Sequence, residues 1–157
     1  LAEADDLATG LRPYEQAYQN SFTAHTHLLL GLEPLGDTSA DVVFLQTFYK
    51  WMTESGANWP QTFFDWFCGK ESEARADASI QNELYAAHAF DPVRADLMAR
   101  RPFRPERLQA GYFNAAQPVS LLVDDVEALW TPIAEQDDWS ALDAKLDHID
   151  QLRLALD

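Results

Sequence analysis

Cysteine is nearly absent from this chain, and its scarcity excludes two kinds of cross-linked fold. Cys68 is the only cysteine among 157 residues, so the chain can form neither an internal disulfide nor a multi-cysteine zinc site. A lone thiol is ordinarily a buried structural residue rather than a nucleophile. We therefore expect Cys68 to be buried and chemically inert.

Basic residues are also scarce. The chain has 11 Lys and Arg against 26 Asp and Glu, a formal net charge of −15. Such a charge repels phosphate backbones and anionic lipids, which argues against nucleic acid and membrane surfaces as partners. No apolar run approaches the ~20 residues that span a bilayer. The acidic first ten residues lack the basic start of a signal peptide. We expect a soluble, cytoplasmic protein.

Recognisable catalytic patterns are missing as well. The 6 glycines are scattered, so there is no glycine-rich phosphate loop, and no Gly-x-Ser-x-Gly turn occurs. Helical metal sites use Glu-x-x-His or His-x-x-x-His spacing, which directs both ligands to one metal. Neither spacing is present. The sequence therefore predicts no catalytic, cofactor-binding or metal-binding residue, and a metal-binding helical bundle is the alternative left open.

The four histidines are interpreted as structural residues. His25 and His27 are two positions apart, roughly 200° around a helix, so their side chains point to opposite sides. His25 continues an apolar stripe and is expected in a core or an interface. His27, His88 and His148 are isolated in the sequence.

Apolar residues at helical spacing are what the chain does contain. Hydrophobic residues make up 47% of it, including 9 Phe, 5 Trp and 5 Tyr, which is enough for a sizeable core in one domain. Steps of three and four residues predict a helix over residues 12–30, ended by Gly31. Its stripe comprises Leu11, Tyr14, Tyr18, Phe22, His25 and Leu29. We expect later segments to pack on this stripe.

The same spacing, together with capping residues, predicts the other helices. The second helix runs from Thr38 or Ser39 to Ser55 and buries Val42, Leu45, Phe48, Trp51 and Met52. The third follows the N-cap Asn58 and covers residues 59–67. Residues 70–79 form either an exposed helix or a loop. Two short helices follow, one over residues 80–89 with Ile80 and Leu84 inward, and one from Asp91 with Val93, Leu97 and Met98 inward.

Two amphipathic helices complete the expected fold. One covers residues 117–135, with Val119, Leu122, Val126, Leu129, Trp130 and Ile133 as its apolar set, and Pro132 should kink it or end it near Thr131. The other starts at Asp138 or Ser140 and buries Leu142, Leu146, Ile149 and Leu156. Because no strand pattern of convincing length occurs, we expect an all-α fold. It should be an irregular bundle of about six to seven helices with an aromatic-rich core, forming one domain over residues 1–157.

One basic patch interrupts this acidic chain. Residues 100–107 read RRPFRPER and contain Arg100, Arg101, Arg104 and Arg107. The two prolines favour an extended connector over a helix. The patch either binds an acidic partner or phosphate, or pairs with carboxylates of this chain, and the second interpretation is favoured.

Three blocks of the chain, taken in order, resemble one known family. The first is residues 11–32, with Tyr14, Phe22 and Leu30-Gly31-Leu32 on the pattern. The second is residues 51–63, with Trp59, Thr62 and Phe63. The third is residues 117–142, with Pro118, Asp138 and Leu142. Together they resemble the C-terminal helical region of the selenoprotein O (SelO) family. Two family pairs differ here, since Asn-Pro is Gln117-Pro118 and Arg-Asn is Val123-Asp124.

The resemblance implies a function for a parent protein rather than for this piece. SelO proteins are similar in fold to protein kinases but transfer AMP from ATP, with a divalent metal such as Mg²⁺, to protein hydroxyl groups. Their catalytic and nucleotide-binding residues lie N-terminal to the matched region, so none is transferred to this chain. The chain, which begins at Leu1, is then expected to be a non-catalytic C-terminal fragment. The kinase-like N-terminal part of the same chain would be its partner. The alternative is an autonomous acidic helical protein-interaction module.

Overall fold

The computed structural model describes residues 4–156, with side chains described at residue 11 and from residue 13 onward. This part of the chain is all-α, which confirms the expected fold class. The α-helices are α1 (Ala4–Leu29), α2 (Thr38–Ser55), α3 (Trp59–Asp65), α4 (Glu73–Asp77), α5 (Asn82–Ala86), α6 (Asp91–Ala99), α7 (Val123–Gln136) and α8 (Ser140–Leu156). Four 3₁₀ turns lie at Gly69–Ser72, His88–Phe90, Pro105–Gln109 and Gly111–Asn114.

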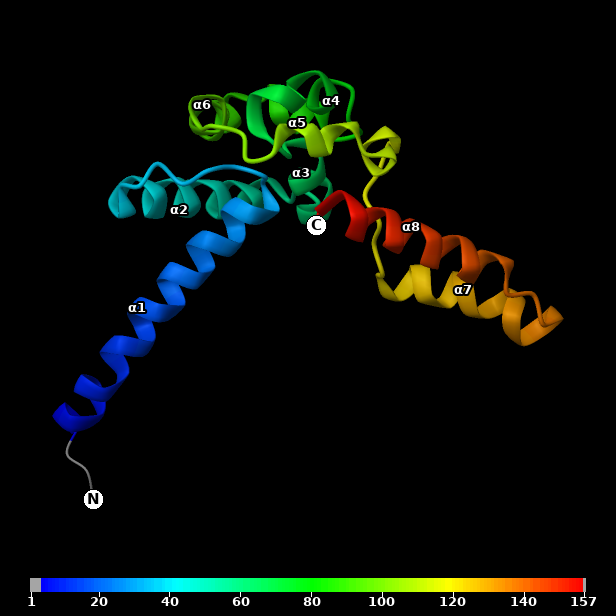
Figure 1. Cartoon of the computed structure of the whole chain (residues 1–157), viewed down its shortest axis with the longest axis horizontal. Helices are drawn as coiled ribbons and strands as arrows, with labels where there is room; N and C mark the ends of the chain where they lie inside the picture. Colours follow the sequence, from blue (N-terminus) through cyan, green and yellow to red (C-terminus); the bar gives the residue numbers. More distant parts are fainter. Residues whose placement is uncertain (1–3, 157) are drawn as a thin grey trace.

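The helices form a central body with two projecting arms (Figure 1). Helices α2 to α6 make the body. The N-terminal part of α1 extends away from one side, and the antiparallel α7–α8 hairpin extends from the other. A helix of 26 residues is about 39 Å long, so the body can cover only the last turns of α1.

Helix α2 covers the predicted residues because its signals are local, but Asp37 caps it rather than Thr38 or Ser39. The Asp37 side chain accepts hydrogen bonds from the amides of Ser39 and Ala40 at 2.9 and 3.3 Å, and Gly56 ends the helix in the left-handed conformation. Its buried side chains include Phe44, Leu45, Phe48, Trp51 and Met52. They pack with residues from the end of α1 and from α4 to α6 into the main core.

A smaller aromatic cluster attaches the C-terminal end of α8 to the body. It contains Phe64, Phe67, Cys68, Tyr112, Phe113 and Ala155, with Leu152 and Leu156 packed against it. Phe67 and Phe113 stack with ring centroids 4.8 Å apart. Cys68 is fully buried here, as the sequence predicted. This contact holds one end of the hairpin, while its turn lies far from the body.

Helix α1 differs from the prediction in both its start and its packing. It is already helical at Ala4, with Pro13 inside it rather than at its start. Leu11, Tyr14 and Tyr18 are 62%, 69% and 55% exposed, so the expectation that later segments cover them is wrong. Because the helix makes one turn every 3.6 residues, the residues of the stripe do lie along one side of α1. However, the stripe extends beyond the body that was expected to bury it.

The segment between α3 and α6 resolves into short helical turns. Residues 70–79 fold into the Gly69–Ser72 turn and α4, so the helical alternative holds for its second half. Ile80 is exposed rather than inward, and Tyr85 and Phe90 are buried instead. In α6, Val93 and Leu97 are buried as predicted.

The third helix, α3, ends at Asp65, two residues before the expected boundary. Its N-cap is Asn58, whose side chain accepts a hydrogen bond from the Gln61 amide at 3.0 Å.

The hairpin departs from prediction at three points. Helix α7 starts at Val123 rather than near residue 117, because the Asp125 carboxylate accepts from the Leu122 amide at 3.1 Å and caps the helix there. It continues past Pro132 to Gln136, so of the two alternatives at Pro132 the end near Thr131 is wrong, and the kink stays a prediction. Leu146 of α8 is exposed rather than buried, because α7 covers only one side of α8.

The close packing of Gly69 provides a test of this fold. Gly69 has φ +56°, and a Cβ added there would lie 2.6 Å from the Leu97 carbonyl oxygen. Gly69→Ala should therefore lower the free energy of unfolding by about 2–4 kcal/mol. The matched control is Gly56→Ala, where φ is +69° but no atom lies within 4 Å of the added Cβ, and about 1–2 kcal/mol is expected. Equal losses in urea denaturation of the two variants would contradict the packing.

Candidate functional site

A fully buried charged side chain, Arg100, lies at the end of α6. Its Nη1 donates to the carboxylate of Asp41 in α2, and Nη1 also lies 3.1 Å from Nε2 of His27 in α1. All three residues are buried. The Arg100 guanidinium lies 4.1 Å from the centroid of the Phe44 ring, a cation–π contact. This cluster joins three helices that are distant in sequence.

The hydrogen bonds of the cluster define the state of the histidine. His27 Nδ1 is 2.8 Å from the carbonyl oxygen of Thr23, which can only accept, so Nδ1 carries the hydrogen. Nε2 can then accept from Arg100. In this arrangement His27 is a neutral bridge between the α1 backbone and a buried cation.

Asp41 is the charge that balances Arg100. Burial alone would raise the pKa of Asp41, but hydrogen bonds from Arg100 and from the Leu35 amide outweigh it and lower that pKa. The Leu35 amide donates at 3.1 Å, which fixes the loop before α2. Arg100, Asp41 and His27 use their polar atoms to bind one another. The cluster therefore has the geometry of a structural joint between helices.

These contacts revise the histidine and arginine interpretations. His25 is exposed, so its expected place in the core is wrong, and its place in an interface stays a prediction. His27 is not isolated, because Arg100 and Asp41 lie beside it from other parts of the chain. Of the basic patch, Arg100 pairs with Asp41, and Arg101 lies 3.5 Å from Glu33, as the favoured interpretation predicted.

A second buried polar cluster lies between α3 and α5. Asp65 accepts from Gln61 Nε2 and from the Tyr85 hydroxyl, each at 2.8 Å, and from the Ser79 hydroxyl. Burial raises the pKa of Asp65 against the opposing effect of these donors, and it also raises the pKa of Tyr85. Because Asp65 is 1% exposed, a substrate has no direct approach to its carboxylate.

Cys68 has the properties of a structural thiol. Burial raises its pKa to about 11, so little thiolate exists at neutral pH. Its Sγ donates only a long 3.7 Å contact to the Phe103 carbonyl oxygen. Among the described residues, no group of three or more His, Cys, Asp or Glu side chains is arranged to hold a metal ion.

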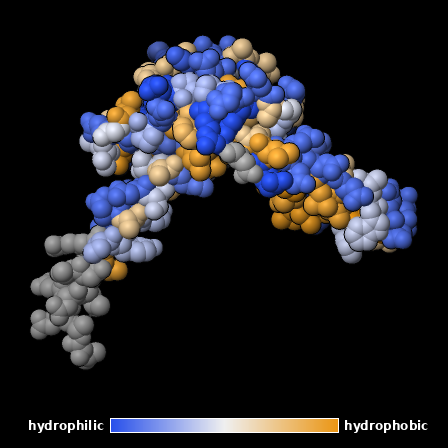
Figure 2. All heavy atoms as spheres, viewed as in Figure 1, coloured by the Kyte–Doolittle hydropathy of each residue, from blue (hydrophilic) through white to orange (hydrophobic). Residues whose placement is uncertain are grey.

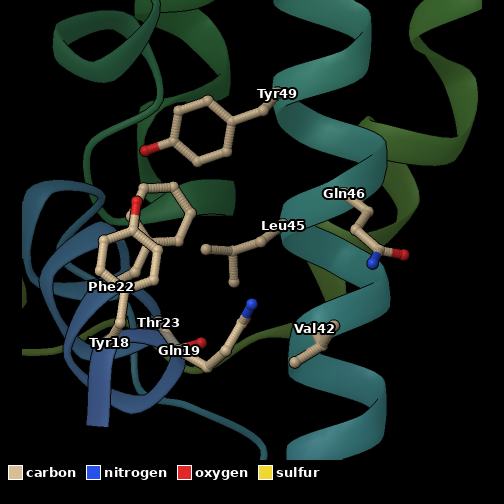
Figure 3. Close-up of a pocket in the computed structure, with 8 residues that line it drawn as sticks. All are labelled: Tyr18, Gln19, Phe22, Thr23, Val42, Leu45, Gln46 and Tyr49. Atoms are coloured by element: carbon tan, nitrogen blue, oxygen red, sulfur yellow. The ribbon is translucent and has the colours of Figure 1, made fainter. Parts of the chain in front are cut away.

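The described surface offers an apolar groove where α1 meets α2. It has a volume of about 250 Å³ and lies between the facing sides of the two helices (Figure 3). The labelled lining residues are Tyr18, Gln19, Phe22, Thr23, Val42, Leu45, Gln46 and Tyr49. Figure 3 shows the Tyr18 and Phe22 rings, which stack on each other, beside Leu45. The groove continues the exposed stripe of α1 onto the body.

A second apolar surface covers α7 in the hairpin, visible as an orange area on that arm in Figure 2. Its exposed residues are Leu122, Val123, Val126 and Trp130. The large apolar residues of α7 span an arc of about 120° at 100° per residue, and the contact with α8 leaves part of this arc exposed. The arc itself follows from the sequence spacing, but its exposure was not predicted.

Comparisons with protein-family models, with curated proteins and with solved structures find no match to this chain. Within residues 4–156, no helix combines the length and apolarity needed to cross a membrane. The candidate sites are therefore described from geometry alone: two closed polar clusters and two open apolar surfaces.

Replacing Asp41 tests the structural joint. Asp41→Asn leaves Arg100 buried without a counter-charge and should lower the free energy of unfolding by about 3–5 kcal/mol at neutral pH. The folded-state pKa of Asp41 is lowered, so its stabilisation is complete above the ordinary value of 3.8 and is lost as the pH falls through the folded pKa. Denaturant unfolding from pH 7 into acid should therefore show the wild type converging on the variant.

The matched control for Asp41→Asn is Glu33→Gln, which removes only the exposed pair with Arg101. Its expected loss is about 0–1 kcal/mol. Equal losses in the two variants, or a difference between wild type and Asp41→Asn that grows in acid, would contradict the role given to Asp41.

Proposed function

We propose that this chain is a non-catalytic helical domain that packs on and supports the kinase-like core of a SelO-like protein. Such a protein transfers AMP from ATP to protein hydroxyl groups. The observation that carries the proposal is the uncovered aromatic stripe of α1. Soluble monomers rarely expose a large contiguous apolar surface without a binding role.

The stripe is an ordered surface. Ring centroids of Tyr14 and Tyr18 are 6.5 Å apart, those of Tyr18 and Phe22 are 6.0 Å apart, and those of Phe22 and Tyr49 are 5.1 Å apart. Four rings thus run from the arm to the body. Tyrosine combines a large apolar area with few rotatable bonds, which suits it to interfaces.

The position of the stripe supports the proposed partner. Residues 11–32, which carry it, are also the first block that resembles SelO. A kinase-like core in the same longer protein would bury the rings and extend the groove between α1 and α2. The arm would then be one wall of an interface within a single chain.

The buried carboxylates favour a structural role for this chain over a catalytic one. Transfer from ATP needs a base, a metal and groups that hold the phosphates in one place. In the described region, Asp41 is balanced by Arg100, and Asp65 is enclosed by its three donors. We assign ATP and Mg²⁺ binding to the proposed core and none to this chain.

Calorimetry tests this assignment. Titration of Mg·ATP into this chain should give no binding heat, whereas a longer SelO-like protein that contains it should give a saturable isotherm. Saturable ATP binding by this chain alone would contradict the non-catalytic role. A gene that encodes this chain without any kinase-like region would contradict the proposed partner.

Charge placed on the stripe tests the interface separately. Tyr14→Glu should leave the melting temperature of this chain within about 2 °C, because the site is exposed. In the longer protein it should cause a clear decrease, because a carboxylate would be buried against the core. Asn20→Glu, on another side of α1, is the matched control and should change neither protein. Unchanged stability of the longer Tyr14→Glu protein would place the interface elsewhere.

A further inference from the structure

The α7 surface is independent of the α1 stripe and points to a partner of different character. Val123 and Trp130 are 73% and 62% exposed, and Val126 between them is also exposed. At 100° per residue these three side chains fall within a sector of about 60° on one side of α7. They form one narrow apolar ridge.

Helix α8 extends this ridge into a face. Leu146 is half exposed and lies one turn after Leu142, which packs inward. Helix α8 runs antiparallel to α7 (Figure 1). Leu146 lies about 40° further around α8 than Leu142, and this rotation places the Leu146 side chain on the side of the hairpin that holds Val126 and Trp130. Figure 2 shows hydrophobic atoms gathered on one side of the arm that α7 and α8 form. The hairpin face is defined here by Val123, Val126, Trp130 and Leu146.

Carboxylates surround this face. Residues 123–156 contain nine Asp and Glu but only two Lys and Arg. Glu127 follows the ridge residue Val126 on α7, and Asp143 and Asp147 lie on one side of Leu146 on α8; all three are exposed. No ion pair with a Lys or Arg is found for them among the described residues.

We infer that the hairpin face binds an amphipathic helix of a partner protein that carries Lys and Arg beside its apolar side. The apolar side of such a helix would pack on the ridge and exclude water from it, as in helix-in-groove recognition. The acidic rim attracts basic residues and repels acidic ones. A basic side chain that crosses Trp130 would gain both a cation–π contact and a nearby carboxylate.

Charge makes this partner a better fit than a second copy. A second copy would bring the same nine carboxylates against those already present, which opposes association. Nucleic acid and anionic lipid carry the same sign of charge as the rim. The inference does not depend on the proposed function, because it concerns another arm and a different partner.

A model peptide tests the inference on the whole chain. The probe is a fluorescein-labelled peptide of about 18 residues, with Leu at helical a and d positions and Lys elsewhere. Its anisotropy should rise saturably with the chain, and the affinity should weaken as salt rises from about 50 to 300 mM. A peptide with Glu in place of Lys should not bind, and a scrambled Lys peptide should bind at least tenfold more weakly.

Variants place the binding site. Trp130→Ala should weaken binding about tenfold or more, and Val123→Ser, at another exposed position, should weaken it as well. Glu127→Lys should weaken binding and reduce its salt dependence. Glu83→Lys makes the same charge change on α5 and should leave affinity within about twofold. Circular dichroism of each variant should match the wild type, since all four side chains are exposed.

Three outcomes would overturn the inference. The first is equal binding of the helical and scrambled Lys peptides, which would show attraction to net charge alone. The second is equal weakening by Glu83→Lys and Glu127→Lys. The third is a dimer in light scattering that Trp130→Ala dissociates, which would show that a second copy covers the face.

Discussion

The buried contact of Arg100 with Asp41 and His27 is the interaction on which the arrangement of the helices depends. It ties the end of α6 to the start of α2 and to α1 at the point where α1 leaves the body. A buried cation without its partner is costly, so these three helices can separate only at a large free-energy cost. The direction in which the α1 arm projects is therefore set by a polar contact as well as by apolar packing.

Aromatic side chains also hold the helices together, and they gather in a larger main core and a smaller second cluster. The main core is closed around Trp51, Trp66, Tyr85 and Phe90, whose large side chains bury the most area. The second cluster holds the hairpin at one end only. Both arms consequently keep apolar surface that the body does not reach. This is why the compact part contains enclosed polar groups, whereas the surfaces suited to binding lie on the arms.

The two open surfaces differ in chemistry. The α1 stripe is a stack of rings that leads into a groove, and its rings would suit a large apolar interface. The hairpin face is rimmed by carboxylates, and such a rim favours a basic partner and faster association. In the two proposals, one arm holds the domain to a larger protein and the other arm recruits a second protein.

Local signals in the sequence specified the helical class and the elements that depend on them, such as α3 with its cap at Asn58 and the extent of α2, although α2 is capped by Asp37 rather than by Thr38 or Ser39. Periodicity also identified the apolar stripes, because spacing along a helix is a local property. Only the tertiary structure decided which stripes are covered, leaving Tyr14 and Trp130 exposed. It also decided that His27 rather than His25 is buried, because the partner Arg100 lies 73 positions away along the chain.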